Sequence, residues 1–146
     1  MLVFILVTTL AASSLVVSYT TQSRRDKEEQ LLFAGAQLRR AIASYYNTVP
    51  PGGARSLPPS LEALLDDQRF PTAIQHLRRI YLDPMTGQAD WDLIRESGGI
   101  VGVASRSAQS PIKKQGFPKG FEYFENKERY SDWVFSIRGV PGDPSR

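Results

Sequence analysis

The first 23 residues contain no charged side chain, and this feature constrains the fold more than any other. Leucine, valine, isoleucine and phenylalanine dominate the stretch. A helix of about 20 apolar residues is about 30 Å long, which matches the thickness of the hydrocarbon core of a bilayer. The pattern therefore predicts a transmembrane helix over residues 1–23.

A cleaved secretory signal is the main alternative for this segment, because the small residues at positions 11–14 offer a cleavage point. Two observations argue against it. No Lys or Arg precedes the apolar run, and nothing breaks the helix where the run ends, since the first glycine is Gly35 and the first proline is Pro50. We therefore expect the membrane segment to continue as a helix in water.

Residues 24–47 have the pattern of an amphipathic helix. Positions 24–29 carry charges of both signs and predict a polar collar just beyond the membrane. Further along, apolar or small residues recur at steps of four and three, on one helical face: Leu31, Gly35, Leu38, Ile42 and Tyr45. The stripe lasts barely two heptads, which is short for a coiled coil, so we expect a small domain to cover it.

Composition limits what that domain can be. The chain has 146 residues and 41% apolar residues, enough for one domain with a small core. It has no cysteine, which excludes disulfides and thiolate metal sites. The net charge of +3 is a mild excess that is typical of a solvated surface.

The globular α+β domain is predicted over residues 48–138. Prolines and glycines between positions 50 and 59 should end the long helix near Asn47. Ser60 can then cap a short helix with Glu62 near its positive end. A tight turn is expected at residues 83–87, where Asp83 can bond the backbone beside a proline and a glycine.

Three later segments alternate or concentrate apolar residues and are predicted as strands: 91–95, 100–105 and 133–138. Gly98 and Gly99 should form a hairpin between the first two. Residues 107–120 are predicted as an exposed excursion, and residues 139–146 as a flexible tail. One face of such an antiparallel sheet needs a cover, and the amphipathic part of the first helix is the available one.

No catalytic arrangement is recognisable in the sequence, and we predict that the chain is not an enzyme. His76 is interpreted as a surface or helix-cap histidine, and Asp90 and Asp92 as solvent-facing residues at the start of a strand. The glycines around position 100 lack the order of a phosphate-binding loop. No nucleophile, base and orienting residue are expected to converge.

Several of these segments together resemble a known family, the major pseudopilins of type II secretion systems and their relatives among the type IV pilins. The resemblance is carried by the apolar run, the charged collar, the proline-terminated helix end, the short helix, and a segment with basic residues, Asp-Pro and Gly followed by Trp91: residues 2–17, 24–29, 38–46, 60–65 and 77–87. It implies a pilin-like fold, with a long N-terminal helix packed on a small antiparallel sheet.

The resemblance also implies a function and a location. The chain would assemble with copies of itself, other pseudopilins and inner-membrane secretion machinery, as a single-pass inner-membrane protein with its globular domain in the periplasm. Arg24, Arg25 and Lys27 lie after the span, so the positive-inside rule alone would place the domain in the cytoplasm. Family members have a basic leader, a Gly and Phe at the cleavage point and a glutamate soon after, none of which is present here. The printed start is then internal to the family motif, or the chain is a divergent member.

Two alternatives concern ligands. Many major pseudopilins bind calcium in an acidic loop before the last strand, where this chain has Glu125, Asn126, Glu128, Ser131 and Asp132 without EF-hand spacing. We name no ligands and expect no other cofactor. The second alternative is a single-pass anchored binding domain, including a DNA-binding minor pilin, that uses exposed basic residues. Those residues are Arg78, Arg79, Arg106, Lys113, Lys114 and Lys119.

Overall fold

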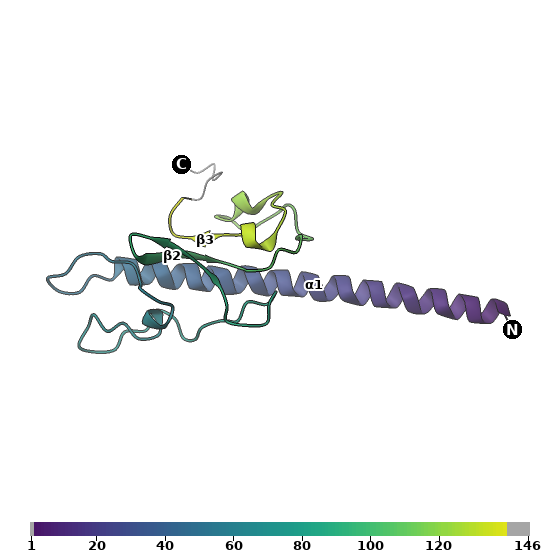
Figure 1. The fold of residues 1–146 in the computed structure, drawn as a ribbon, viewed down its shortest axis with the longest axis horizontal. Coiled ribbons are helices and arrows are strands. Elements are labelled where there is room, and N and C mark those ends of the chain that lie inside the picture. Colours follow the sequence, from purple (N-terminus) through teal and green to yellow (C-terminus); the bar gives the residue numbers. More distant parts are fainter. Residues whose placement is uncertain (1, 140–146) are drawn as a thin grey trace.

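The computed structural model describes the backbone of residues 2–139 and the side chains of residues 19–139. One long helix, α1 (Leu2–Asn47), comes first. It is followed by a three-stranded antiparallel sheet: β1 (Asp92–Glu96), β2 (Gly99–Ala104) and β3 (Phe135–Ser136). The sheet lies along the C-terminal part of α1, and the loops gather around both (Figure 1). The predicted α+β architecture, with a long helix packed on a small sheet, is confirmed.

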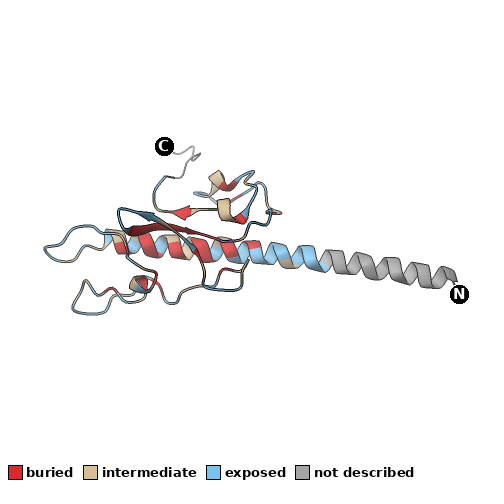
Figure 2. Ribbon diagram, viewed as in Figure 1, coloured by how far each residue is buried: buried red, intermediate tan, exposed pale blue. Residues whose placement is uncertain are grey.

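Helix α1 has 46 residues, or about 69 Å at 1.5 Å per residue. It ends at Asn47, as predicted, before the proline and glycine segment. Figure 2 shows that the helix surface is exposed just outside the domain and becomes buried where the domain begins. The predicted stripe is the covered face, since Leu31, Leu38 and Ile42 are fully buried and Tyr45 is 4% exposed.

Strand β2 is the centre of the sheet, and every one of its residues is buried. It pairs with β1 on one side and with β3 on the other, where Val103 lies opposite Phe135. Val103 and Phe135 share one apolar cluster with Leu38, Ile42 and Trp133. The predicted contact between the helical stripe and the inward residues of the last strand is therefore confirmed.

Three local predictions needed correction. The short helix after Ser60 is a single 3-10 turn, Glu62–Leu64, in which the Ser60 hydroxyl accepts a hydrogen bond from the Ala63 N–H. The hairpin turn is made by Ser97 and Gly98, both with positive φ, whereas Gly99 already belongs to β2. The last strand is Phe135–Ser136, two residues instead of the six predicted, and a 3-10 turn, Tyr130–Asp132, precedes it.

The predicted excursion at residues 107–120 is exposed over most of its length, but two of its side chains are buried. Pro111 is buried and Phe117 is only 9% exposed. The Phe117 ring packs edge-on against the rings of Phe124 and Trp133, with centroids 5.7 and 5.1 Å away. The segment therefore contributes Phe117 to the core and buries Pro111, while most of its other residues are exposed as predicted.

Most of the predicted membrane segment falls outside the described residues, because side chains 1–18 are not described. Among residues 19–139, no helical stretch is both long and apolar enough to cross a bilayer. The tail predicted at residues 139–146 also lies outside the described part of the chain, except for its first residue.

The stripe of α1 leads to a stability prediction. Ile42 is fully buried against the sheet, so Ile42→Ala should lower the free energy of unfolding by about 2–4 kcal/mol. Arg40 is exposed, and Arg40→Ala should change it by less than about 0.5 kcal/mol. Thermal unfolding of a polypeptide that starts at residue 24 compares the two directly. If the Ile42→Ala and Arg40→Ala variants melted at the same temperature, the packing of α1 against the sheet would be disproved.

Candidate functional site

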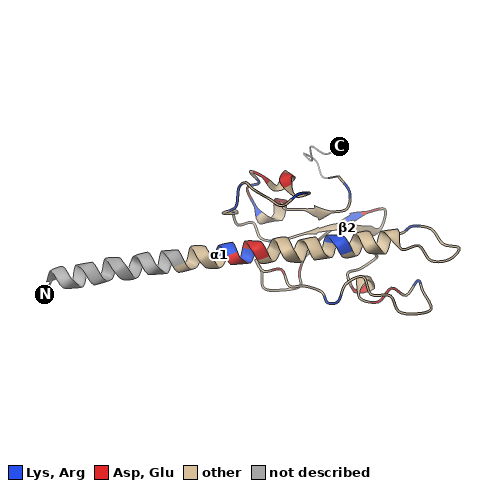
Figure 3. Cartoon of the chain, turned by 180° about the vertical axis from the view of Figure 1, so that it is seen from behind, with Lys and Arg blue, Asp and Glu red and all other residues tan. Residues whose placement is uncertain are grey.

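The outward surface of α1 is a candidate site, because the domain covers only one side of the helix. Residues 19–27 stand clear of the sheet (Figure 2), and Tyr19 is 77% exposed. Figure 3 shows basic and acidic residues next to one another along this part of α1, as predicted for the polar collar. One member of the collar behaves differently, because Glu28 is only 3% exposed.

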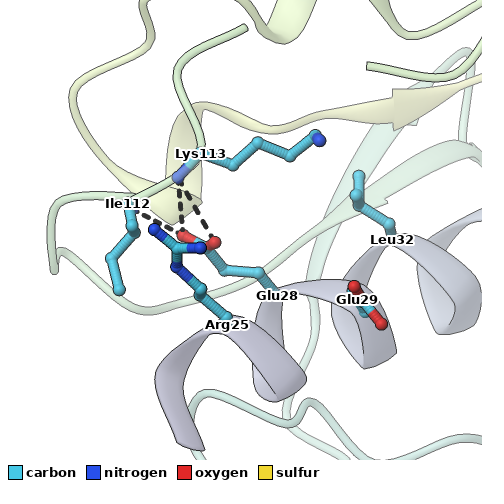
Figure 4. Close-up of a pocket in the computed structure, with 6 residues that line it drawn as sticks. All are labelled: Arg25, Glu28, Glu29, Leu32, Ile112 and Lys113. Atoms are coloured by element: carbon cyan, nitrogen blue, oxygen red, sulfur yellow. Dashed lines mark hydrogen bonds between the residues drawn. The ribbon is translucent and has the colours of Figure 1, made fainter. Parts of the chain in front are cut away.

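Glu28 fastens the segment after β2 to the helix. One carboxylate oxygen, Oε1, accepts hydrogen bonds from the Ile112 N–H at 2.6 Å, the Lys113 N–H at 3.2 Å and the Tyr130 hydroxyl at 2.9 Å. Figure 4 shows the Glu28 side chain directed at this backbone, while Glu29 lies apart from it. Burial, together with the bond to Glu28, raises the pKa of Tyr130. The carboxylate thus sets the position of the domain on α1.

Asp83 has the same role for the turn before β1. Its carboxylate is fully buried and accepts hydrogen bonds from the Met85 N–H at 2.9 Å and the Ser105 hydroxyl at 2.7 Å. The Gly87 N–H donates to the Asp83 carbonyl at 2.7 Å, and Gly87 has a φ of +75°. The predicted tight turn with an Asp bonded to the backbone is confirmed, and it is tied to the end of β2.

The third buried carboxylate, Asp67, brings together residues that the sequence was not expected to unite. His76 Nε2 lies 3.0 Å from Asp67 Oδ2, and His76 Nδ1 lies 2.8 Å from the hydroxyl of Ser44 on α1. Because a carboxylate only accepts, Nε2 donates to Asp67, and in the neutral imidazole Nδ1 accepts from Ser44. The sequence analysis predicted that no nucleophile, base and orienting residue would converge. The structure corrects this prediction, because a hydroxyl, an imidazole and a carboxylate lie within hydrogen-bond distance of one another. The His76 side chain is 2% exposed, which corrects its interpretation as a surface residue.

The surroundings of this triad favour a structural role. Ser44 lies in the last turn of α1, where the helix presents carbonyls and the negative end of its dipole, which opposes an oxyanion. Asp67 is also paired with Arg69 at 2.6 Å, and Arg69 donates to the Tyr45 carbonyl at 2.9 Å. The cluster clamps the segment 66–76 onto the end of the helix.

The clamp predicts a specific pH dependence. Hydrogen bonds from Arg69, and to a smaller extent from His76, hold the pKa of Asp67 well below its usual range. A folded-state pKa below the unfolded value means that the carboxylate stabilises the fold fully above about pH 4 and loses this effect as the pH falls further. Asp67→Asn should therefore cost about 2 kcal/mol at pH 7, and the difference from the wild type should shrink toward pH 3. Urea unfolding at both pH values measures it, and a difference independent of pH would refute the assignment.

A shallow groove beside α1 brings together two exposed apolar side chains, Phe33 and Leu82. It has a volume of about 390 Å³ and lies between the helix and the segment before β1. Phe33 is 56% exposed and Leu82 is 58% exposed on its walls. The Tyr81 ring packs edge-on against Phe33, with centroids 5.8 Å apart, and the Arg79 guanidinium lies 5.0 Å from the centre of the Tyr81 ring. Exposed apolar side chains gathered in one groove are typical of an interaction site.

Comparison with protein-family models, curated proteins and solved structures gave no match. The functional conclusion therefore depends on the geometry of this chain. The two features of the chain on which that conclusion depends are the outward surface of α1 and the groove at Phe33.

The other residues singled out in the sequence are dispersed. Asp92 is exposed, as predicted, whereas Asp90 is half-buried and accepts a hydrogen bond from the Thr86 hydroxyl. In the proposed calcium loop, Asp132 accepts a hydrogen bond from the Arg129 N–H at 3.1 Å. Across the side chains that the structure describes, no three His, Asp or Glu residues are grouped closely enough to hold a metal ion.

The six basic residues weighed for nucleic-acid binding lie in more than one place. Arg79 borders the groove at Phe33, whereas Lys113 borders a groove at Leu32. Successive residues of a helix point about 100° apart, so the two grooves open on different sides of α1. Lys114 Nζ is occupied by the Lys127 carbonyl at 3.0 Å. These positions do not form one continuous basic face.

Proposed function

We propose that this chain is a pilin-like subunit that assembles into a filament of the type II secretion or type IV pilus class. One observation carries the proposal: a single helix, α1, is covered by the domain on one side from Glu28 onward, while its residues 19–23 project beyond the domain. Between them, the Arg24 guanidinium donates a hydrogen bond to the Ser110 carbonyl of the domain at 2.8 Å. A helix that enters a small sheet domain at one end and leaves its other end free is suited to bundling with the same helix of other copies. We assign the chain no catalytic role.

The proposal includes a location. The uncharged residues 1–23 would lie in the inner membrane, with the domain in the periplasm, and the partners would be lipid, copies of this chain, other pseudopilins and the inner-membrane secretion machinery. Extraction from the bilayer would move the apolar helix surface from lipid into the filament core, where neighbouring helices cover it.

Protease treatment of cells that produce the full chain tests the location. With the domain in the periplasm, it is digested in spheroplasts and protected in intact cells. Digestion only after the inner membrane is opened would place the domain in the cytoplasm, as the positive charges at Arg24, Arg25 and Lys27 would favour.

Assembly is tested separately with an amine-reactive crosslinker, by comparing cells with and without a secretion or pilus assembly machine. A filament subunit should give crosslinked species larger than a dimer that depend on the machine. A chain that stays monomeric in both cases would instead be an anchored binding domain. We do not propose nucleic-acid binding, because Arg79 and Lys113, two of the basic residues weighed for it, border grooves on different sides of α1.

A further inference from the structure

The groove at Leu32, where α1 enters the domain, has charges of both signs around half-buried apolar side chains. It has a volume of about 310 Å³ and lies between α1 and the segment after β2 (Figure 4). The helix and the segment together supply its lining: Arg25, Glu28, Glu29, Leu32, Ile112 and Lys113. The four helical residues are three or four positions apart, so they share one face of α1.

We infer that this groove binds the headgroup of a phospholipid that carries a phosphate and a primary ammonium, as in phosphatidylethanolamine. The Arg25 guanidinium and the Lys113 ammonium hold the phosphate, and the Glu29 carboxylate accepts hydrogen bonds from the lipid ammonium. The inference rests on the membrane part of the proposed function, because it needs residues 1–23 to lie in a bilayer. It depends neither on filament assembly nor on the side of the membrane that the domain occupies.

The depth of the groove fits this ligand. The hydrocarbon core of a bilayer is about 30 Å thick and the whole bilayer about 40–45 Å, so each headgroup layer is about 5–8 Å thick. With the span ending at Ser23, Arg25 lies about 3 Å and Glu29 about 9 Å beyond the hydrocarbon core along α1. Arg25 is therefore inside the headgroup layer, and Glu29 is at its outer edge, which the ammonium at the end of the headgroup can reach.

The side chains assigned to the two ends of the ligand are available. Among the residues that the structure describes, neither the Arg25 guanidinium nor the Glu29 carboxylate has a hydrogen bond or an ion pair. Glu28, in contrast, is occupied, because its carboxylate accepts the N–H groups of Ile112 and Lys113. These bonds hold the segment against α1 and bring the Lys113 side chain to the groove.

The mixed charge of the groove favours an amine-bearing headgroup over the headgroups of other phospholipids. Phosphatidylcholine has the same phosphate, but its trimethylated ammonium has no N–H to donate to Glu29. Phosphatidylglycerol has a net negative charge and would leave Glu29 beside an anion without a partner. In phosphatidylethanolamine both charged ends have a partner, and the half-buried Leu32 and Ile112 contact the carbons between and below them.

Native mass spectrometry of the full chain tests this selectivity. The chain is released from detergent micelles that contain equal amounts of phosphatidylethanolamine and phosphatidylcholine with identical acyl chains, and the bound lipids are identified by mass. Phosphatidylethanolamine should be bound about threefold more often, as expected for a charge pair at an exposed carboxylate. Equal binding, or binding of neither lipid, would overturn the inference. A preference for phosphatidylglycerol, when it is added in equal amount, would also overturn it.

Two substitutions separate the two ends of the ligand. Glu29→Gln should bring the ratio of the two bound lipids close to one, because the phosphate partners remain while the ammonium partner is lost. Arg25→Gln should lower the binding of both lipids about threefold. The matched controls are Asp26→Asn and Lys27→Gln, which remove the same charges from exposed positions of α1 outside the groove and should change neither amount. A Glu29→Gln chain that keeps the wild-type ratio would disprove the assignment.

Soluble phosphoethanolamine, which has the same headgroup without acyl chains, distinguishes a lipid from a free metabolite. At the concentration of the lipid it should not displace phosphatidylethanolamine, because the acyl chains hold the lipid headgroup at a high effective concentration beside the groove. Displacement would assign the groove to a soluble ligand and overturn the inference.

The result is separate from the test of assembly. Lipid selectivity in a chain that stays monomeric beside the assembly machine would disprove the filament and leave the headgroup site in place. Machine-dependent crosslinked species without lipid selectivity would disprove the headgroup site alone.

Discussion

Gly35→Leu should lower the free energy of unfolding by at least about 2 kcal/mol, because the helix touches the sheet at this position without a side chain between them. Gly35 is buried on α1, and a Cβ built there would collide with three atoms of the Phe135 ring. Phe135 is itself fully buried, so its ring has little room to move. Leucine is a better helix former than glycine by roughly 0.8 kcal/mol, so helix propensity alone would stabilise the variant. A loss of stability must therefore come from the collision with Phe135.

Two further variants make this prediction specific. Arg40→Leu makes a comparable substitution on the exposed side of α1 and should leave the midpoint of urea unfolding nearly unchanged. Phe135→Ala alone should cost about 3–5 kcal/mol, and adding Gly35→Leu to it should recover part of that loss by filling the space. If Gly35→Leu unfolds at the wild-type urea concentration, the close approach of α1 and β3 is wrong.

Glu28→Ala should be the second severe substitution, with a loss of about 3 kcal/mol or more. It would leave the N–H groups of Ile112 and Lys113 and the Tyr130 hydroxyl without their acceptor, and each buried donor left unpaired costs about 1–3 kcal/mol. Glu29→Ala, one residue further along α1, removes an exposed carboxylate and should cost less than about 0.5 kcal/mol.

Hydrogen exchange locates the effect of the Glu28 substitution. In Glu28→Ala, the amides of Ile112 and Lys113 should exchange faster than they do in Glu29→Ala. Unchanged protection at both amides would contradict the role of Glu28 as the point that holds this segment to the helix.

The sequence predicted those helix and strand bounds that are set by residues close by in the chain. The end of α1 at Asn47 follows from the prolines after it, and the first two strands lie within one residue of their predicted bounds. The last strand was predicted too long because alternation identifies buried side chains and not ladder pairing. Trp133 is fully buried, as alternation predicts, but its backbone (φ −84°, ψ 84°) follows a 3-10 turn and stays outside the ladder.

The interior carboxylates show where sequence reasoning ends. Glu28 lies three residues before Leu31 and seven before Gly35, so the spacing of the apolar stripe already placed it on the covered face. Its charge led to the opposite interpretation, as a member of the exposed collar. Its partner Tyr130 is 102 residues away, and no local pattern connects them. The same holds for Ser44, which meets His76 only through the tertiary fold.

Electron cryomicroscopy of assemblies isolated from cells that produce the full chain with an assembly machine tests the central claim most directly. The account predicts a filament in which α1 of every copy runs parallel in the core, with the sheet domains forming the outer layer. A filament whose core is made of the sheet domains, or a chain that stays monomeric beside a working machine, would contradict it.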